Sequence, residues 1–217
     1  MLDKKIQNSP AQDTSPQNIN EAALSYMEQK YGEKFEYVAP WGNSMSGTHQ
    51  LLVSCASFPG EEIAVQVENN RAGDKVFRDN YLAVKYQQQT AGFFEECSKK
   101  VFTEAEAFCV VRKDGLSEDL PANASFEEYL SDSRANLVIL VEVRESDFED
   151  ESQLNELVKL VGKYGTRYLL KTVIVKDGDF GSYDAYSLED VIGKTKLARC
   201  VIVDNSRGKT EIRWFGE

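Results

Sequence analysis

The sequence has a single histidine, His49, and four cysteines that are far apart and form no CxxC pair. The cysteines are Cys55, Cys97, Cys109 and Cys200. Structural zinc sites are built from clustered cysteine and histidine ligands, so a site of this kind is excluded and we expect no bound metal. Free cysteine is among the most buried residue types. We therefore predict four small buried apolar side chains, with one disulfide as the alternative.

The sequence also lacks long apolar runs and an excess of positive charge. No run of about 20 apolar residues occurs, so we expect no transmembrane segment. The 25 Lys and Arg face 36 Asp and Glu, a formal net charge of −11, whereas a nucleic-acid surface needs a basic stripe. No Walker A or GxGxxG motif follows an expected strand. We expect no cofactor and no nucleic-acid partner, which leaves an unknown protein or small-molecule ligand.

The first 18 residues are polar and rich in Gln, Asn, Ser and Pro, with no hydrophobic signal-peptide segment. Such a segment cannot bury apolar surface, so we expect a disordered tether. Two interpretations are open. The tether belongs either to an exported protein whose export signal is absent from the sequence given, or to a cytoplasmic protein with a polar tail.

The longest segment with helical periodicity runs from Asp79 to Phe102. Apolar residues recur there at spacings of four and seven: Leu82, Tyr86, Phe93, Cys97 and Val101. This spacing predicts one apolar stripe on an amphipathic helix. Asp79 suits the first turn, and Lys99 and Lys100 suit the carbonyl end. Strand-like alternation occurs on both sides of this segment, so a sheet is expected to cover the stripe.

Shorter elements are predicted on either side of the long helix. Before it we expect a helix over 20–31 that ends at Gly32, strands over 34–39, 49–55 and 62–68, and a turn over 69–73 that leads into the long helix. After it we expect strands over 104–112, 137–143, 167–175, 197–203 and 209–215, helices over 125–128 onward and 150–164, and a helical turn over 187–192. The strand over 137–143 is apolar on both faces and should be central.

The order of these elements predicts an α+β fold in which helices pack on largely antiparallel sheet. The order helix, strand, strand, strand occurs twice, and the motif Lys-Tyr-Gly recurs at 30–32 and 163–165. This echo indicates two αβββ halves joined by the long helix, although glycine after a helix is common in any case. We predict a tether over 1–18, an N-terminal αβββα unit over 19–103 and a C-terminal α+β unit over 104–217, with one continuous domain as the alternative.

The loop that contains Ser44, followed by His49, is the strongest candidate for catalysis. A serine nucleophile needs an imidazole base, but the hydrolase elbow requires glycine two residues after the serine, and that residue is Ser46. A base so close in sequence rarely points at its nucleophile. A serine hydrolase is therefore the less favoured hypothesis, and no catalytic residue is assigned. The residues expected to make binding contacts, together with exposed sheet edges, are Trp41, Asn43, Ser44, Ser46, His49 and Trp214.

Two acidic runs raise the question of a cation site. The run over 145–151 leads into a helix start, where the helix dipole favours carboxylates. The run Asp177–Asp184 resembles a calcium loop, but Ser182 and Leu188 occupy the places of the required glycine and glutamate. We predict helix capping for the first run and a polar surface loop for the second.

Two segments carry a resemblance to a known family. Residues 23–37 (ALSYMEQKYGEKFEY) and 76–86 (VFRDNYLAVKY) are similar to a family of uncharacterised lipoprotein-like, exported proteins of Gram-positive anaerobes. The resemblance covers Glu21 to about Phe102. It implies export and a lipid-anchored N-terminus, and it implies no activity. The αβββ order also resembles cystatin-like and beta-lactamase-inhibitor-like folds, but a fold does not fix a function.

The functional expectation is an extracytoplasmic binding or protein-interaction module without catalytic activity. It rests on the tether, the acidic composition, the resemblance and the poor match to each catalytic motif. A cytoplasmic regulatory or immunity-type protein is the alternative, because acidity and free thiols are equally expected there.

Overall fold

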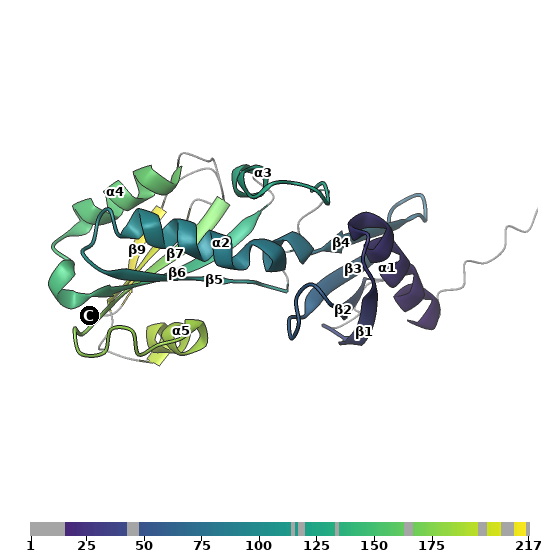
Figure 1. Cartoon of the computed structure of the whole chain (residues 1–217), viewed down its shortest axis with the longest axis horizontal. Helices are drawn as coiled ribbons and strands as arrows, with labels where there is room; N and C mark the ends of the chain where they lie inside the picture. Colours follow the sequence, from purple (N-terminus) through teal and green to yellow (C-terminus); the bar gives the residue numbers. More distant parts are fainter. Residues whose placement is uncertain are drawn as a thin grey trace, which may run out of the picture.

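The computed structural model describes residues 16–42, 48–113, 116, 120–132, 135–162, 167–194, 199–204 and 211–215; over the last two ranges it describes the backbone alone. These residues form an elongated molecule of two lobes, each built on its own sheet (Figure 1). The tether predicted over 1–18 lies mainly outside the described residues, and the first helix already begins at Pro16.

The N-terminal lobe consists of one helix packed on a four-stranded antiparallel sheet. Its elements are α1 (Pro16–Tyr31), β1 (Phe35–Pro40), β2 (His49–Cys55), β3 (Ile63–Asn69) and β4 (Lys75–Asp79), with strand order β1-β2-β3-β4. Ile19, Ala23 and Met27 recur every four residues and are buried against the sheet, as the helical spacing predicts. Gly32 ends α1 with a φ of +72°, a conformation that a residue with a Cβ rarely adopts.

Strand β4 was not expected, and it changes where the long helix begins. The sequence prediction placed a turn directly before a helix that starts at Asp79. Instead, Lys75–Asp79 pairs with β3, and helix α2 runs from Tyr81 to Ser98. The strand is short, lies at the sheet edge and carries basic residues at both Lys75 and Arg78, so it has no clear alternating apolar pattern.

The C-terminal lobe consists of a five-stranded sheet with helices on both faces. Its elements are β5 (Ala105–Val110), α3 (Phe126–Ser131), β6 (Asn136–Arg144), η2 (Glu145–Asp147), α4 (Glu151–Val161), β7 (Arg167–Val175), α5 (Ala185–Lys194), β8 (Arg199–Asp204) and β9 (Glu211–Phe215). The strand order is β5-β6-β7-β8-β9. Helices α2, α3 and α4 pack on one face and α5 on the other (Figure 1).

The predicted α+β class is confirmed, but the second lobe does not repeat the first. Strand β7 follows α4, yet it pairs in parallel with β6, and α5 intervenes between β7 and β8. The other neighbours in this sheet are antiparallel. A helix that connects parallel neighbours is the usual crossover, so α4 has a role that α1 lacks. Strand β6 lies inside the sheet, as its apolar faces predicted.

The apolar stripe of α2 is continuous with the cores of both lobes. Leu82, Tyr86 and Cys97 are buried as predicted, whereas Phe94 is fully buried in place of the half-buried Phe93. Tyr81, in the first turn of α2, stacks on Tyr31 of α1 with ring centroids 3.8 Å apart. The helix therefore covers the second sheet while its first turn is packed against the first lobe.

Cys55, Cys97 and Cys109 form no disulfide bond. The described helices include none that is long and apolar enough to cross a bilayer. Cys97 and Cys109 are buried, as expected, and Cys55 is half-buried. The side chain of Cys200 lies outside the described residues.

Candidate functional site

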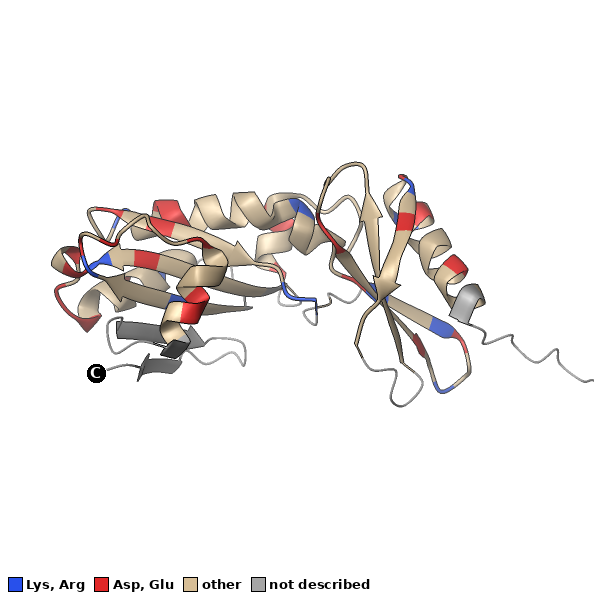
Figure 2. Cartoon of the chain, turned by 90° about the horizontal axis from the view of Figure 1, so that it is seen from below, with Lys and Arg blue, Asp and Glu red and all other residues tan. Residues whose placement is uncertain are grey.

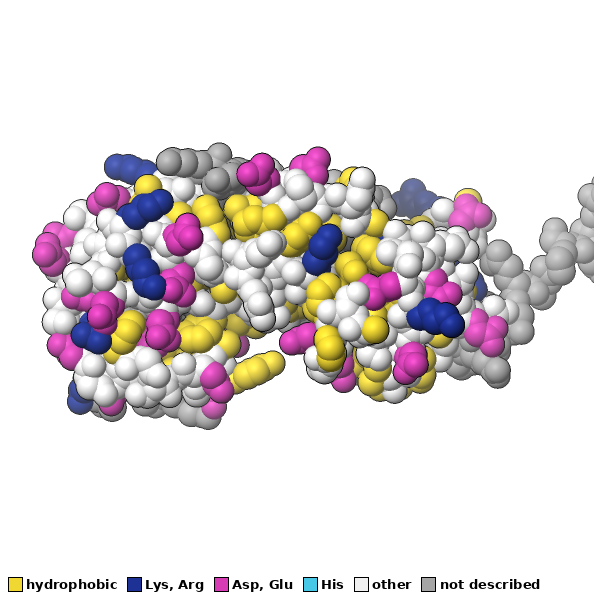
Figure 3. All heavy atoms as spheres, in the orientation of Figure 1, with side chains coloured by type: hydrophobic (Ala, Val, Ile, Leu, Met, Phe, Trp, Pro, Cys, Tyr) yellow, Lys and Arg dark blue, Asp and Glu magenta, His cyan; other side chains and the backbone are white. Residues whose placement is uncertain are grey.

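A cleft of about 300 Å³ lies where the two lobes meet. Its lining comes from the loop before β3, from α2, from the end of β5 and from α5. The lining residues are Gly60, Glu61, Glu62, Asn80, Gln87, Cys109, Val110, Val111, Lys113, Ala185, Tyr186 and Glu189. The space-filling view shows the notch between the lobes, with hydrophobic and acidic side chains around it (Figure 3). Segments more than 100 residues apart in sequence therefore share one concave surface.

Asn80 holds the inner wall of the cleft in place. The Asn80 side chain is buried, its Oδ1 accepts a hydrogen bond from the Ala64 N–H at 2.7 Å, and its Nδ2 donates to the Arg112 carbonyl at 3.3 Å. These bonds join β3, the start of α2 and the segment after β5. Since buried amides are costly to leave unpaired, this residue fixes the relative position of three elements.

An ion pair closes one side of the cleft. Lys113 Nζ lies 2.5 Å from Glu62 Oε2, and both side chains are more than one-third exposed. Exposed pairs of this kind contribute about 0–1 kcal/mol to stability. The pair therefore connects the lobes weakly. A charged ligand group can replace either partner of the ion pair at a small cost in free energy.

Tyr186 forms the rim of the cleft. It lies in the first turn of α5 and is 83% exposed, the highest exposure among the large hydrophobic side chains that the structure describes. An exposed aromatic ring beside a concave surface supplies apolar contact area at a small cost in side-chain entropy. Tyr186 is therefore the lining residue best placed to cover a bound molecule.

Cys109 is the only thiol on the cleft wall among the described lining residues. Burial raises the pKa of Cys109 to about 12, so the thiol stays protonated at neutral pH and is a poor nucleophile. Gln87 Nε2 donates to the Cys109 carbonyl at 3.0 Å. The described part of the cleft thus offers apolar contact, amides and charges, and it holds no Ser, Thr or His that could act as a nucleophile or base.

The residues predicted from the sequence as binding contacts lie away from this cleft or outside the described residues. Trp41 is half-buried and donates its backbone N–H to the Gln50 carbonyl at 2.9 Å, and His49 opens β2 opposite Val67. Asn43, Ser44 and Ser46 lie outside the described residues, as does the Trp214 side chain. His49 is the first residue of β2 and Trp41 lies beside Gln50 near the same end, whereas the cleft lies beyond the other end of β2. About 20 Å of strand therefore separates them from the cleft.

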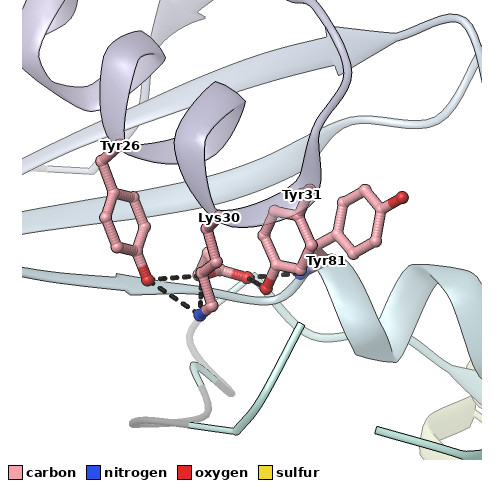
Figure 4. A network of polar contacts seen from close by, with 5 residues as sticks. Tyr26, Lys30, Tyr31 and Tyr81 are labelled. Carbon is pink, nitrogen blue, oxygen red and sulfur yellow. Dashed lines mark hydrogen bonds and ion pairs between the residues drawn. The ribbon is translucent and has the colours of Figure 1, made fainter. Parts of the chain in front are cut away.

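A second polar cluster surrounds the carboxylate of Asp79, which is 1% exposed. Three side chains of α1 point at it: Tyr26 at 3.0 Å, Lys30 at 2.8 Å and Tyr31 at 2.6 Å (Figure 4). The backbone N–H of Tyr81 donates to it at 3.1 Å. Both carboxylate oxygens are occupied by protein donors, so the cluster is a structural joint between α1, β4 and α2.

The hydrogen bonds of Tyr81 extend this joint toward the β2–β3 loop. Tyr81 Oη donates to Glu33 Oε1 at 2.6 Å, and Ser57 Oγ donates to Glu33 Oε2 at 2.7 Å. Burial by itself would raise the pKa of Glu33, but the hydrogen bonds from Tyr81 and Ser57 outweigh it and lower the pKa. Glu33 is therefore ionised at neutral pH and accepts both bonds.

A third polar group, Glu142, lies inside the second sheet. It is fully buried on β6, its Oε1 accepts from the Gly181 N–H at 3.2 Å, and its Oε2 has no hydrogen-bond partner in the described part of the chain. Burial raises its pKa to about 7, with the Gly181 hydrogen bond opposing the shift and the charge of Glu106 adding to it. Glu106 is its cross-strand partner on β5.

The two acidic runs cap helices and gather no cation site within the described residues, where no group of three potential metal ligands occurs. Asp150 Oδ1 accepts from the Ser152 N–H at 2.6 Å at the start of α4. Asp184 Oδ1 accepts from the Ser187 N–H at 2.8 Å at the start of α5. Both are ordinary helix-start hydrogen bonds.

No protein-family model matches the chain, and no curated protein matches it. The chain is similar in structure to a crystal structure of a DUF5037 family protein from Ruminococcus gnavus ATCC 29149, with 15% sequence identity over 89% of this chain and 94% of that chain and a TM-score of 0.43. This is a distant structural neighbour. The function must therefore be argued from the geometry of this chain.

Proposed function

We propose that this protein is a binding module whose ligand binds in the cleft between the two lobes. The observation that carries the proposal is the cleft itself: a preformed hollow of about 300 Å³ with Tyr186 exposed at its rim and Asn80 fixed in its wall. Ligand sites are typically concave, largely preformed and supplied with a few oriented polar groups. The lining combines these features at the meeting point of four chain segments.

Binding without catalysis is the activity that the described lining supports. The Cys109 thiol is held protonated by its raised pKa, and the ammonium group of Lys113 is paired with Glu62. General acid–base chemistry needs a titrating group near its reactant with a pKa close to the working pH. Glu142 has such a pKa, but it lies in the sheet interior and does not line the cleft.

We further propose that the protein is exported and lipid-anchored, as the resemblance of residues 23–37 and 76–86 implies. The polar segment over 1–18 is suited to serve as a tether between a membrane anchor and the first lobe. The gene and cell fractions test this proposal. An upstream hydrophobic segment ending in a lipobox cysteine, with the protein in the membrane fraction, supports it. Recovery in the cytosol of the native host favours the regulatory or immunity-type alternative.

Replacing Tyr186 with alanine is expected to weaken binding in the cleft about tenfold, equivalent to about 1.4 kcal/mol. The ring is 83% exposed, so its removal should leave the fold intact. The measurement is a thermal-shift screen of a panel of small metabolites and short peptides, followed by titration of each hit against the wild type and the variant.

The matched control is Tyr37→Ala, because Tyr37 is also exposed but lies on β1 of the N-terminal lobe. Hits that lose affinity with Tyr186→Ala and keep it with Tyr37→Ala support the cleft as the site. The proposal is wrong if every hit binds both variants equally, or if no member of the panel stabilises the wild type.

A further inference from the structure

The open edge of the second sheet is a groove, and the cleft is one end of it. Strand β5 is the outermost strand of this sheet, next to β6 alone. A second hollow of about 440 Å³ lies along the same strand, lined by Glu95, Lys99, Glu104, Ala105, Glu106, Ala107, Phe108 and Phe180. The cleft continues it at Cys109, Val110 and Val111. The two hollows together follow residues 104–111, a length of about 25 Å.

The alternation of side chains shows that both hollows lie at the strand edge. Neighbouring residues of a strand point to opposite faces of the sheet. Ala105 and Ala107 pack toward α2, and Phe108 packs toward α5, yet all three line one hollow. A single hollow can contact both faces of a strand only where it passes around the edge. The groove therefore has α2 above it and Phe180 and α5 below it, as Figure 1 shows for these elements.

Backbone groups of β5 point into this groove. The Cys109 carbonyl accepts a hydrogen bond from the Gln87 side chain of α2, so it is turned away from β6. In an antiparallel strand the N–H and C=O of one residue point to the same side, and the direction alternates along the strand. Ala105 and Ala107 therefore share the outward direction of Cys109. Ala107 and Cys109 are each 7% exposed and line the hollows, whereas Ala105 is 1% exposed. The outward backbone groups that a ligand can reach are therefore those of Ala107 and the Cys109 N–H.

The groove is acidic. Six carboxylates and two ammonium groups line the two hollows: Glu61, Glu62, Glu95, Glu104, Glu106 and Glu189 against Lys99 and Lys113. Four of these carboxylates form ion pairs, with Lys113, Lys99, Arg144 and Lys171. Within the described part of the chain Glu61 and Glu106 form none, so two carboxylates remain for a ligand. Figure 2 shows the positions of acidic residues along the ribbon of this lobe, with fewer basic positions among them.

We propose that the ligand of this protein is an extended basic peptide segment that adds to the second sheet as a strand alongside β5. This inference rests on the proposed function, because the cleft forms one end of the groove. Backbone hydrogen bonds to Ala107 and to the Cys109 N–H supply affinity, as in other cases of strand addition. Lys or Arg side chains of the segment lie on the α5 face, where they meet Glu106, and the alternate apolar side chains lie on the α2 face beside Ala107 and Cys109.

The edge at β1 is built differently. The β1–β2 register shifts between Tyr37 and Ala39, and the strand ends in Pro40. Bulges and prolines are the usual means of keeping an edge strand from pairing with another chain. Strand β5 keeps one regular register over Ala105–Val110. A single extended peptide can reach the recessed edge of β5, whereas α2 and α5 sterically exclude the edge strand of another folded sheet.

The test uses a fluorescent octapeptide of alternating lysine and valine, with binding measured by anisotropy on the full chain. Two further peptides carry N-methyl groups on every lysine or on every valine amide. An added strand directs every second N–H at β5, so one methylated isomer should bind at least tenfold more weakly and the other within about threefold of the parent. Glu106→Lys should weaken the parent peptide at least fivefold. Glu36→Lys, the same charge change on the exposed face of β1, should have little effect.

The outcomes separate this inference from the proposed function. Strand addition is supported if one methylated isomer loses much more affinity than the other and if Glu106→Lys weakens binding of the parent peptide. If the two methylated isomers lose affinity equally, or lose none, while Tyr186→Ala still weakens binding, the peptide binds in the cleft through its side chains alone. Strand addition is then wrong, and the proposed function stands. Absence of binding by the parent peptide also overturns the inference, and the small-molecule panel then decides the proposed function by itself.

Discussion

Replacing Asp79 with alanine is expected to lower the free energy of unfolding by about 3–5 kcal/mol, the usual cost of removing one partner of a buried charged pair. Asp79 is 1% exposed and accepts bonds from Tyr26, Lys30, Tyr31 and the Tyr81 backbone. Burial and the charge of Asp79 raise the pKa of Tyr31, so this phenol remains a donor over the working pH range. Removing the carboxylate leaves these donors without their acceptor and places the ammonium group of Lys30 beside an apolar site.

Urea denaturation at pH 7 measures the effect, followed by both tryptophan fluorescence and circular dichroism. Tyr26→Phe is the graded control, because it removes one donor and keeps the ring that stacks on Phe77 at 4.7 Å; it should cost about 1 kcal/mol. If Asp79→Ala costs no more than Tyr26→Phe, the carboxylate does not hold the joint together.

Replacing Glu142 with glutamine is expected to stabilise the protein above pH 7 by about 2–3 kcal/mol and to leave it nearly unchanged below pH 4.5. The folded-state pKa of Glu142 is about 7, raised from 4.5 by burial. Between these two values the unfolded chain loses its proton and the folded chain keeps it, so stability falls as pH rises through this window. Glutamine is uncharged and can still accept the Gly181 hydrogen bond, so this part of the pH dependence should disappear.

Chemical denaturation at pH 4.5, 6 and 8 gives the required comparison. Glu106→Gln is the control, because it removes the nearby charge that adds to the shift and keeps the buried carboxyl group. It should reduce the loss of stability between pH 4.5 and 8 only in part. Parallel pH profiles for the wild type and Glu142→Gln would show that the carboxyl group is already solvated in the folded state.

Elements with strong local signals could be predicted from the sequence nearly to the residue. The capping box at Ser125 is present in full: Ser125 Oγ accepts from the Glu128 N–H at 3.2 Å, and Glu128 Oε2 accepts from the Ser125 N–H at 2.7 Å. Strand β2 has the predicted bounds, His49–Cys55. Strand β4 was missed because edge strands need little apolar patterning, and α5 proved longer than the predicted helical turn.

The candidate site could not be predicted for a different reason. Its parts, 60–62, 80–87, 109–113 and 185–189, are brought together by the packing of two sheets along α2, and no local spacing encodes this. Tyr186 gave no signal, because an aromatic residue at a helix start is more often part of the core. The loop at 43–47 was predicted to make binding contacts from its Ser and Gly content, which is typical of a turn as well as of a site. It lies outside the described residues, so this remains a prediction.

Helix α2 also determines how far the two lobes can be treated as interchangeable modules. Its buried stripe, which includes Leu82, Phe94 and Cys97, belongs to the second lobe, while Asp79 and Tyr81 fasten its start to the first. If the chain were cut after α2, the helix would stay with the first lobe and its apolar stripe would lose the second sheet that covers it. If the chain were cut before α2, the hydrogen bonds between Asp79 and the first turn of the helix would be lost. The described chain therefore has no boundary at which the two lobes can be separated without loss. Insertion, duplication or exchange of one lobe would have to preserve this helix and its contacts with both lobes.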